Sequence, residues 1–311
     1  MSLDFSIIIP TYNRIELLRC CLHYLEALNY PRSQFEVIVV DDGSSDETAG
    51  LEPKGWNLNL RVIHQPNSGT SMARNAGIEA ARGTFCMFVD DDVMVHPDLL
   101  LEHFRLHTAQ PRRLVRGPVI NFSALPCPLE NKTPEKPGSL PERLWKLWSG
   151  CSLSMLRHFS MNYLCTSNAS LARIHLQAAG MFDPSFVRWE DADLGVRLKK
   201  LGIERCFSLE AVVYHLKPEE PWDRRILTAR KDGRSAAELY LRYPGTAMLL
   251  RSGIHAANIL RNSIFTKGPL RGEIEKAAGG GKSLLFSQSF AQNMLLEEAY
   301  LEAGSQRLKR T

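Results

Sequence analysis

The chain has 311 residues, enough for one large domain or two small ones with a sizeable core. Its 44% apolar and 23% charged residues are ordinary for a soluble globular protein. The net charge of +4 and the pI near 8.7 are only mildly basic and give no argument for nucleic-acid binding, so we expect no nucleic-acid partner.

The cysteines and the apolar runs bear on the compartment. The seven cysteines are odd in number and show no Cys-x-x-Cys spacing, which fits reduced thiols in a cytosolic protein. The chain leads directly into an apolar strand pattern instead of a signal peptide, and no apolar run approaches the roughly 18–20 residues of a membrane-spanning helix. We therefore expect a cytoplasmic protein.

The first 90 residues alternate between strand and helix patterns. Strands are predicted over residues 5–9, 35–40, 60–63 and 84–89, and helices over residues 17–28 and 69–81. A turn follows the second strand, with Ser45 or Asp46 as the N-cap of a helix. This alternation predicts an α/β fold with a mostly parallel central sheet flanked by helices.

The middle of the chain gives weaker signals. A helix is predicted from Pro97 to about Gln110, and one strand over residues 114–120. Prolines concentrate in residues 121–141, which predicts a surface loop that closes over a ligand. Further elements are predicted as a strand and tight turn over 163–171, a helix over 190–201 and a short strand over 211–214.

After Pro221 the pattern becomes helical. Helices are predicted over residues 222–242, 246–265 and 284–303, with a Gly-rich hinge at 278–283 and a disordered basic tail after Gly304. On the 246–265 helix, Arg251, His255, Asn258 and Asn262 share one face. The simplest interpretation is a packed surface helix, and the alternative is peripheral membrane contact at the inner face, which would suit a lipid-linked acceptor.

Three acids, Asp90-Asp91-Asp92, directly follow the predicted fourth strand. Adjacent carboxylates disfavour one another's ionised form, and the sequence window holds no counter-charge, so a divalent cation would resolve the conflict. Open α/β sheets bind ligands at the carboxyl ends of their strands, which is where these acids lie. Taken alone, the triplet is equally compatible with a metal site and with a solvated acidic turn.

Other polar residues also follow predicted strands. On its own, Asp41-Asp42 indicates a turn, and His215 indicates a histidine whose hydrogen bonds are satisfied within the protein. In a parallel sheet, however, the carboxyl ends of the strands that these residues follow lie together. Carboxylates with an imidazole suit Mn²⁺, whereas carboxylates with water suit Mg²⁺.

Two further positions have both a structural and a functional interpretation. Asp191 lies in the first turn of a helix, where acids stabilise the helix dipole by about 0.3–1 kcal/mol, and where a carboxylate can also act as a general base. Its neighbour Trp189 either stacks on a sugar ring or anchors the loop. Arg74 is either solvated or recognises a phosphate or carboxylate through its planar fork.

Five segments of the chain stand out together: Phe5–Arg14 (FSIIIPTYNR), Val39–Asp46 (VVDDGSSD), Asn67–Gly77 (NSGTSMARNAG), Phe88–Asp92 (FVDDD) and Glu190-Asp191. In their order and spacing, over about residues 5–215, they closely resemble the family 2 glycosyltransferases. The resemblance implies a GT-A fold, an inverting mechanism, a nucleotide-diphosphate sugar donor and a divalent cation, Mn²⁺ or Mg²⁺.

The resemblance implies roles for individual residues. On the donor side, Pro10, Tyr12 and Asp42 would lie at the nucleotide base, and Arg74 would hold this pocket together near the base or the diphosphate. Asn168 falls in a turn that resembles an acceptor-lining segment, although Ser167 stands where relatives often have glycine.

The same resemblance assigns the metal and the base. Asp90 and Asp92 would form the Asp-x-Asp motif, with Asp92 on the metal and Asp90 near the ribose or the metal. Asp91 would also contact the donor, and the alternative is that it is only a turn residue. His215 would be a further metal ligand, and Asp191 the catalytic base.

Together these points predict a GT-A type nucleotide-diphospho-sugar transferase fold. Residues 1–220 would form the catalytic domain, with a nucleotide-sugar half over 1–120 and an acceptor half over 121–220, and residues 221–311 a helical extension. The expected activity is that of a hexosyltransferase in cell-surface polysaccharide or glycan synthesis, with a glycan or lipid-linked acceptor. The alternatives are a non-catalytic nucleotide- or glycan-binding protein and a nucleotidyltransferase. Residues 10–14 lack the Gly-rich loop that a nucleotidyltransferase would have.

Overall fold

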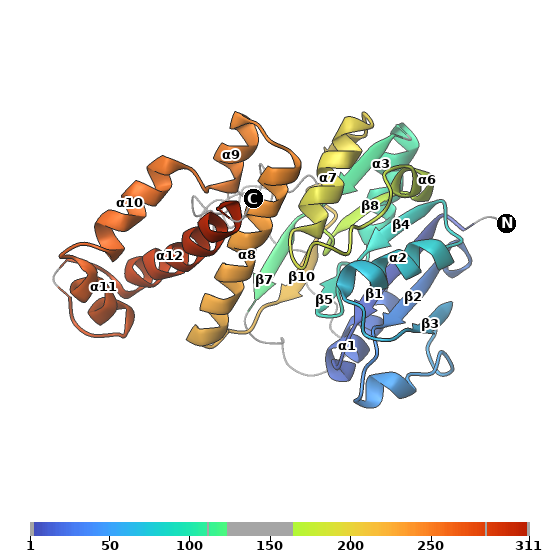
Figure 1. Ribbon diagram of the computed structural model, residues 1–311. Coiled ribbons are helices and arrows are strands. Elements are labelled where there is room, and N and C mark those ends of the chain that lie inside the picture. Colours follow the sequence, from blue (N-terminus) through green and yellow to red (C-terminus); the bar gives the residue numbers. More distant parts are fainter. Residues whose placement is uncertain (1–2, 111, 123–163, 284, 310–311) are drawn as a thin grey trace. The chain divides into compact units, whose positions relative to one another are not determined.

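The computed structural model describes residues 3–110, 112–122, 164–283 and 285–309. The chain divides into two compact units (Figure 1). The sheet unit comprises Met1–Ser185 and Glu190–Pro218, and the helical unit comprises Phe186–Trp189 and Glu219–Thr311. Most of the predicted loop at 121–141 lies outside the described residues.

The sheet unit is built on a seven-stranded sheet of order β3-β2-β1-β4-β8-β6-β9. The four strands from β3 to β4 are parallel, β8 runs antiparallel to both of its neighbours, and β6 and β9 are parallel. The predicted mostly parallel sheet is therefore confirmed. The strands are β1 Phe5–Thr11, β2 Phe35–Asp41, β3 Leu60–His64, β4 Phe85–Phe88, β6 Arg113–Arg116, β8 Ala169–Ala172 and β9 Glu204–Phe207.

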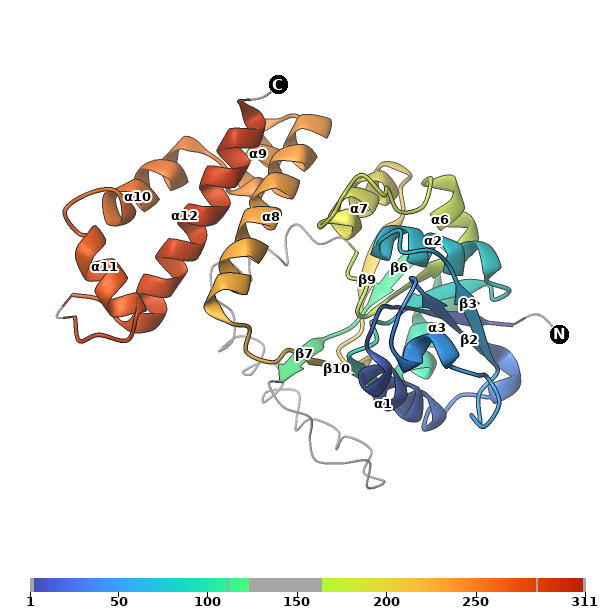
Figure 2. The same cartoon turned by 60° about the horizontal axis from the view of Figure 1, so that its bottom comes forward.

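Helices lie on both faces of this sheet (Figure 2). Because successive side chains of a strand point to opposite sides, Ile7 and Ile9 of β1 pack in one cluster with α1 and α3, and Ile8 packs in another with α2, α6 and α7. A buried parallel sheet needs apolar residues on both faces, which explains the unbroken apolar runs. The helices are α1 Ile15–Glu26, α2 Thr70–Ala80, α3 Leu99–Ala109, α6 Arg173–Ala178 and α7 Glu190–Lys200.

Short 3-10 helices complete the amino-terminal half, η1 Arg32–Gln34 and η2 Glu47–Gly50. The predicted cap is confirmed at Asp46, whose carboxylate accepts a hydrogen bond from the Thr48 amide at 2.9 Å.

A second sheet of order β5-β10-β7 comprises β5 Val93–Val95, β10 Val213–Leu216 and β7 Val119–Phe122. The prediction of one strand over 114–120 was wrong, because β6 and β7 belong to different sheets. The chain changes sheets at Gly117-Pro118, where a Cβ on Gly117 would lie 1.8 Å from the Ala211 carbonyl oxygen. Pro118 lacks the amide that would continue a ladder.

The helical unit comprises α8 Trp222–Arg242, α9 Thr246–Ser252, α10 Ala256–Thr266, α11 Arg271–Ala278 and α12 Gln288–Leu308. The predicted 246–265 helix is two helices, because Gly253 adopts a left-handed φ of 71° and ends α9. The predicted disordered tail after Gly304 is helical as far as Leu308. Arg307 there pairs with Glu238 of α8 at 2.7 Å.

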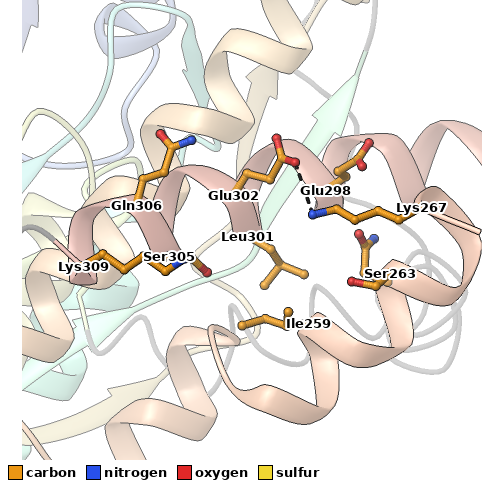
Figure 3. Close-up of a pocket in the computed structure, with 10 residues that line it drawn as sticks. Ile259, Ser263, Lys267, Glu298, Leu301, Glu302, Ser305, Gln306 and Lys309 are labelled. Atoms are coloured by element: carbon orange, nitrogen blue, oxygen red, sulfur yellow. Dashed lines mark ion pairs between the residues drawn. The ribbon is translucent and has the colours of Figure 1, made fainter.

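The helices α8 and α12 run side by side in the same direction (Figure 1). Their backbones approach closely at Gly233, where a Cβ would lie 2.0 Å from the Tyr300 carbonyl oxygen. Between α10 and α12 lies a groove of about 430 Å³, where Ile259 and Leu301 meet and Lys267 pairs with Glu302 at 3.6 Å (Figure 3). In the part of the chain that is described, no helix combines the length and apolarity needed to cross a membrane.

We expect Gly233→Ala to lower the free energy of unfolding by about 1–3 kcal/mol, because the added methyl group forces α8 away from α12. Gly272→Ala in α11 is the matched control. Its Cβ would meet nothing within 4 Å, so this change should be neutral or stabilise the helix by up to about 1 kcal/mol. Denaturant unfolding measures both. Equal stability of the two variants would contradict the close approach.

Candidate active site

The turns after β1 and β2 are fastened to one another. The Asn13 side-chain oxygen accepts a hydrogen bond from the Ser45 amide at 2.7 Å, and the Asn13 amide donates to the Ser44 hydroxyl at 2.8 Å. Gly43, with φ of 80°, lies so near the next turn that a Cβ would come within 2.7 Å of the Asn67 amide nitrogen. These contacts explain why Gly43 and the small polar residues occur together in the sequence.

Asp42 holds the start of α2. Its buried carboxylate accepts hydrogen bonds from the amides of Ser68 and Gly69, both at 2.8 Å, and from the Gln65 side chain at 2.7 Å. A carboxylate suits this place because it satisfies free amides at a helix N-terminus. In the strand and turn opposite, Pro10 is buried and Tyr12 is 48% exposed.

Asp90 is fixed by two partners. Its Oδ1 accepts a hydrogen bond from Arg74 Nη2 at 2.8 Å, and its Oδ2 accepts one from the Ser167 hydroxyl at 2.6 Å. Burial alone would raise the pKa of Asp90, but the Arg74 guanidinium and the Ser167 hydroxyl hold it below its usual value. Asp90 is therefore an ionised group with both oxygens engaged.

Asp91 is not a solvated turn residue. Its buried carboxylate accepts hydrogen bonds from the Thr11 hydroxyl at 2.8 Å and from Arg14 Nη1 at 3.0 Å, which ties it to the end of β1. Burial raises the pKa of Asp91 to about 6, against the opposing effect of Arg14. Its carboxylate thus joins the triplet to β1, and donor contact by Asp91 stays a prediction.

Asp92 lies beside His215. The distance from Asp92 Oδ1 to His215 Nε2 is 3.0 Å, and this carboxylate oxygen is buried without a hydrogen-bond partner among the described residues. Single ligand atoms of Asp90, Asp92 and His215 lie within 4.8 Å of one another. Carboxylate oxygens and an imidazole nitrogen, with one oxygen left unsatisfied, fit a divalent cation such as Mn²⁺.

His215 reaches this place by a different route from the predicted one. It does not follow a strand of the parallel sheet but lies within β10 of the second sheet, paired in register with Val93. Because β5 begins directly after the acid triplet and runs antiparallel to β10, the pairing brings His215 next to Asp92. The expected proximity is correct, but its cause is β5–β10 pairing.

The triplet has counter-charges that no local window contains. Arg14 lies 77 residues before Asp91, and Arg74 lies 16 residues before Asp90. A metal is therefore not the sole source of positive charge for these carboxylates. The tertiary structure supplies two guanidinium groups.

Arg74 connects the triplet to the start of α7. It is 5% exposed, and its second nitrogen, Nη1, donates to Glu190 Oε1 at 2.7 Å. Asp191 follows Glu190 directly. Burial and the negative charge of Glu190 raise the pKa of Asp191 to about 7, although Arg74 opposes this rise. The solvated interpretation of Arg74 was wrong, because two internal carboxylates occupy its fork. Donor contact by Arg74 stays a prediction.

Two other expectations change. Asn168 is fully buried, and its side chain bonds His103 and the carbonyls of Pro118 and Ala211, so it is a packing residue that cannot line an acceptor surface.

Trp189 belongs to the helical unit, where its indole nitrogen donates to Asp232 at 3.1 Å. The anchoring interpretation of Trp189 is the one that the structure supports.

Sequence reasoning missed Arg14, Glu190 and Ser167 as parts of the site. Arg14 and Glu190 both lie inside the segments that resemble the family, but no property of the sequence indicates which charged partner each would meet. Ser167 was noted only as a departure from glycine, and its hydroxyl bonds Asp90.

The Glycosyl transferase family 2 profile matches residues 6–126. The chain belongs to this family. Over 264 residues it is 30% identical to the pre-mycofactocin glycosyltransferase of Mycobacterium tuberculosis, covering 80% of this chain and 50% of that protein. Over 101 residues it is 37% identical to the poly(ribitol-phosphate) beta-N-acetylglucosaminyltransferase TarS of Staphylococcus aureus, covering 32% of this chain and 18% of that protein. The chain thus spans half or less of the length of these two relatives.

Among solved structures, the chain resembles the mannosyltransferase PcManGT from Pyrobaculum calidifontis, determined in complex with GDP-Man and Mn²⁺. The TM-score is 0.61 at 18% identity, covering 99% of this chain and 88% of that one. At this identity the likeness establishes the fold, which is of the GT-A type.

We expect Asp91→Ala to lower the free energy of unfolding by about 1–3 kcal/mol, because the buried Thr11 hydroxyl loses its acceptor. Asp91→Asn keeps an oxygen at this position and should lose less. Thermal or denaturant unfolding in the presence of EDTA measures both changes. An alanine variant as stable as the wild type would show that Asp91 is an ordinary turn residue.

Proposed function

We propose that the protein transfers a sugar from a nucleotide-diphosphate donor to an acceptor hydroxyl, with inversion at the anomeric carbon and with the help of a divalent cation. One observation carries the proposal. A single buried guanidinium, that of Arg74, holds Asp90 of the Asp90–Asp92–His215 cluster and also Glu190, the neighbour of Asp191. A donor-binding group and a candidate base are thereby kept in one rigid arrangement.

Asp92 and His215, with Asp90 beside them, would hold the cation. When bound, the cation supplies charge neutralisation for the departing diphosphate. The turns around Pro10, Tyr12 and Asp42 would receive the nucleotide. Because three of the chain's own donors already bond the Asp42 carboxylate, a base or ribose contact would share its remaining lone pairs.

Asp191 would accept the proton from the attacking hydroxyl. Its raised pKa of about 7 suits a general base, because a carboxylate with an ordinary pKa is a much weaker proton acceptor. A single base without a carboxylate nucleophile is the inverting arrangement, by analogy with glycoside hydrolysis. The alternatives, a non-catalytic nucleotide- or glycan-binding protein and a nucleotidyltransferase, leave a poised base at this position unexplained.

We propose that the acceptor is a glycan or a lipid-linked molecule. The name of the relative TarS describes a beta-N-acetylglucosaminyltransferase acting on poly(ribitol-phosphate), which supports a place in cell-surface glycan synthesis. We propose a hexose or N-acetylhexosamine donor, which the name of TarS and the GDP-Man in the related structure support.

We expect Asp191→Asn to reduce transfer at least about a hundredfold while nucleotide binding persists, because the amide cannot accept the proton. In the wild type, the rate should rise with pH through about 7, since Asp191 is protonated below its pKa and ionised above it. A screen of nucleotide sugars with Mn²⁺ measures product release, and calorimetry measures binding. Wild-type turnover in the asparagine variant would refute the assigned base. Binding of nucleotide without turnover in the wild type would favour the binding protein.

For the helical unit we propose peripheral contact with an anionic membrane at the inner face. The helix α10 packs through its polar side, since Asn262 donates to the Met294 carbonyl at 3.0 Å, and leaves Leu260 67% and Ile264 55% exposed. The unit also contains sixteen basic and ten acidic residues. Exposed apolar side chains together with a basic excess favour an anionic interface.

We expect the wild type to float with vesicles that contain phosphatidylglycerol, and the double variant Leu260→Glu/Ile264→Glu to remain in the soluble fraction. Ile174→Glu, at an equally exposed apolar position of the sheet unit, is the matched control and should float. Failure of the wild type to float would remove this part of the proposal and would leave the transferase activity untouched.

A further inference from the structure

Arg14 covers the candidate metal site from the solvent side. It immediately precedes α1, and its Nη1 lies 3.0 Å from Asp91 Oδ1 and 3.0 Å from Asp92 Oδ2. The Arg14 side chain is 49% exposed, whereas the two carboxylates are largely buried. A half-exposed guanidinium therefore neutralises two acids that water reaches poorly.

The two arginines of the site differ in how readily they can leave. Arg74 is almost completely buried, and breaking its pairs would leave uncompensated buried charges. Arg14 is half exposed, so its head group can be solvated when a carboxylate is released. Asp90 thus has a permanent counter-cation, and Asp92 has an exchangeable one.

Asp92 is also the acid that the candidate cation needs most. Among the described residues, its Oδ1 has no hydrogen-bond partner and lies beside His215, while its Oδ2 accepts a hydrogen bond from Arg14. A divalent ion on Asp92 would stand close to the guanidinium. Two cations at such short range repel, and one carboxylate cannot neutralise both.

We propose that Arg14 is the counter-cation of Asp92 in the metal-free protein and competes with the divalent cation for this carboxylate. Arg14 keeps the acid triplet folded when no cation is bound, and it gives up Asp92 when one binds. The contact with Asp91 remains available to it, so the side chain stays at the edge of the site. This inference rests on the proposed metal site.

The test is the affinity of the full chain for Mn²⁺ alone, without nucleotide, measured by titration calorimetry. Arg14→Met removes the competitor, so we expect Mn²⁺ to bind roughly five- to tenfold more tightly, the equivalent of one hydrogen bond of ordinary net strength. Arg19→Met is the matched control. Arg19 lies on the adjoining helix α1, with similar exposure, but pairs with Glu16 and Glu47 and should leave the affinity unchanged. Arg14→Lys keeps the charge without the fork and should be intermediate.

A second measurement separates competition from a purely structural role. In EDTA, Arg14→Met should melt at a lower temperature than the wild type, and saturating Mn²⁺ should remove most of that difference. A deficit of the same size with and without Mn²⁺ would make Arg14 a structural residue only and would overturn the inference.

The outcomes also distinguish this inference from the metal site itself. Equal or weaker Mn²⁺ binding by Arg14→Met, with binding by the wild type intact, would refute the role of Arg14 alone. If neither protein bound Mn²⁺, the metal site would fail and the inference with it. Binding by the variant but not by the wild type would be the strongest support.

Discussion

Three neighbouring carboxylates at one strand end are the constraint on which this site depends. Their mutual repulsion is relieved by two guanidinium groups, that of Arg74 for Asp90 and that of Arg14 for Asp91 and Asp92. The three acids consequently differ in function although they are adjacent in sequence. One is fixed, one ties the site to β1, and one retains an unsatisfied oxygen that a cation can use.

Arg74 extends this arrangement to the other side of the chemistry. Its burial between Asp90 and Glu190 makes both ion pairs costly to break, so the start of α7 cannot move independently of the triplet. The same environment sets the pKa of Asp191, which burial and Glu190 raise and Arg74 lowers. Arg74 therefore both balances the charge of Asp90 and holds in place the start of the helix that carries the candidate base, Asp191.

The helical unit follows a different rule. Its two long helices approach closely because Gly233 carries no side chain at their contact, and α10 turns asparagines inward, where backbone carbonyls satisfy them. Buried amides are tolerated only with such partners. Ile259, Leu260 and Ile264 of α10 are left exposed, although Phe265 packs inward, which differs from an ordinary surface helix.

The alternating strands and helices, the parallel half of the sheet, the family and the set of acids could all be predicted, because they follow from local periodicity and from contiguous segments. The pairing of the charges could not, because it arises only when the chain folds. Arg14 and Asp91 are 77 residues apart, His215 arrives through β5–β10 pairing, and Asn168 turns inward to His103. The break of residues 114–120 into two strands likewise depends on the Ala211 carbonyl against Gly117. Contacts between distant segments leave no local pattern, so the counter-ions of the site could not be predicted from the chain alone.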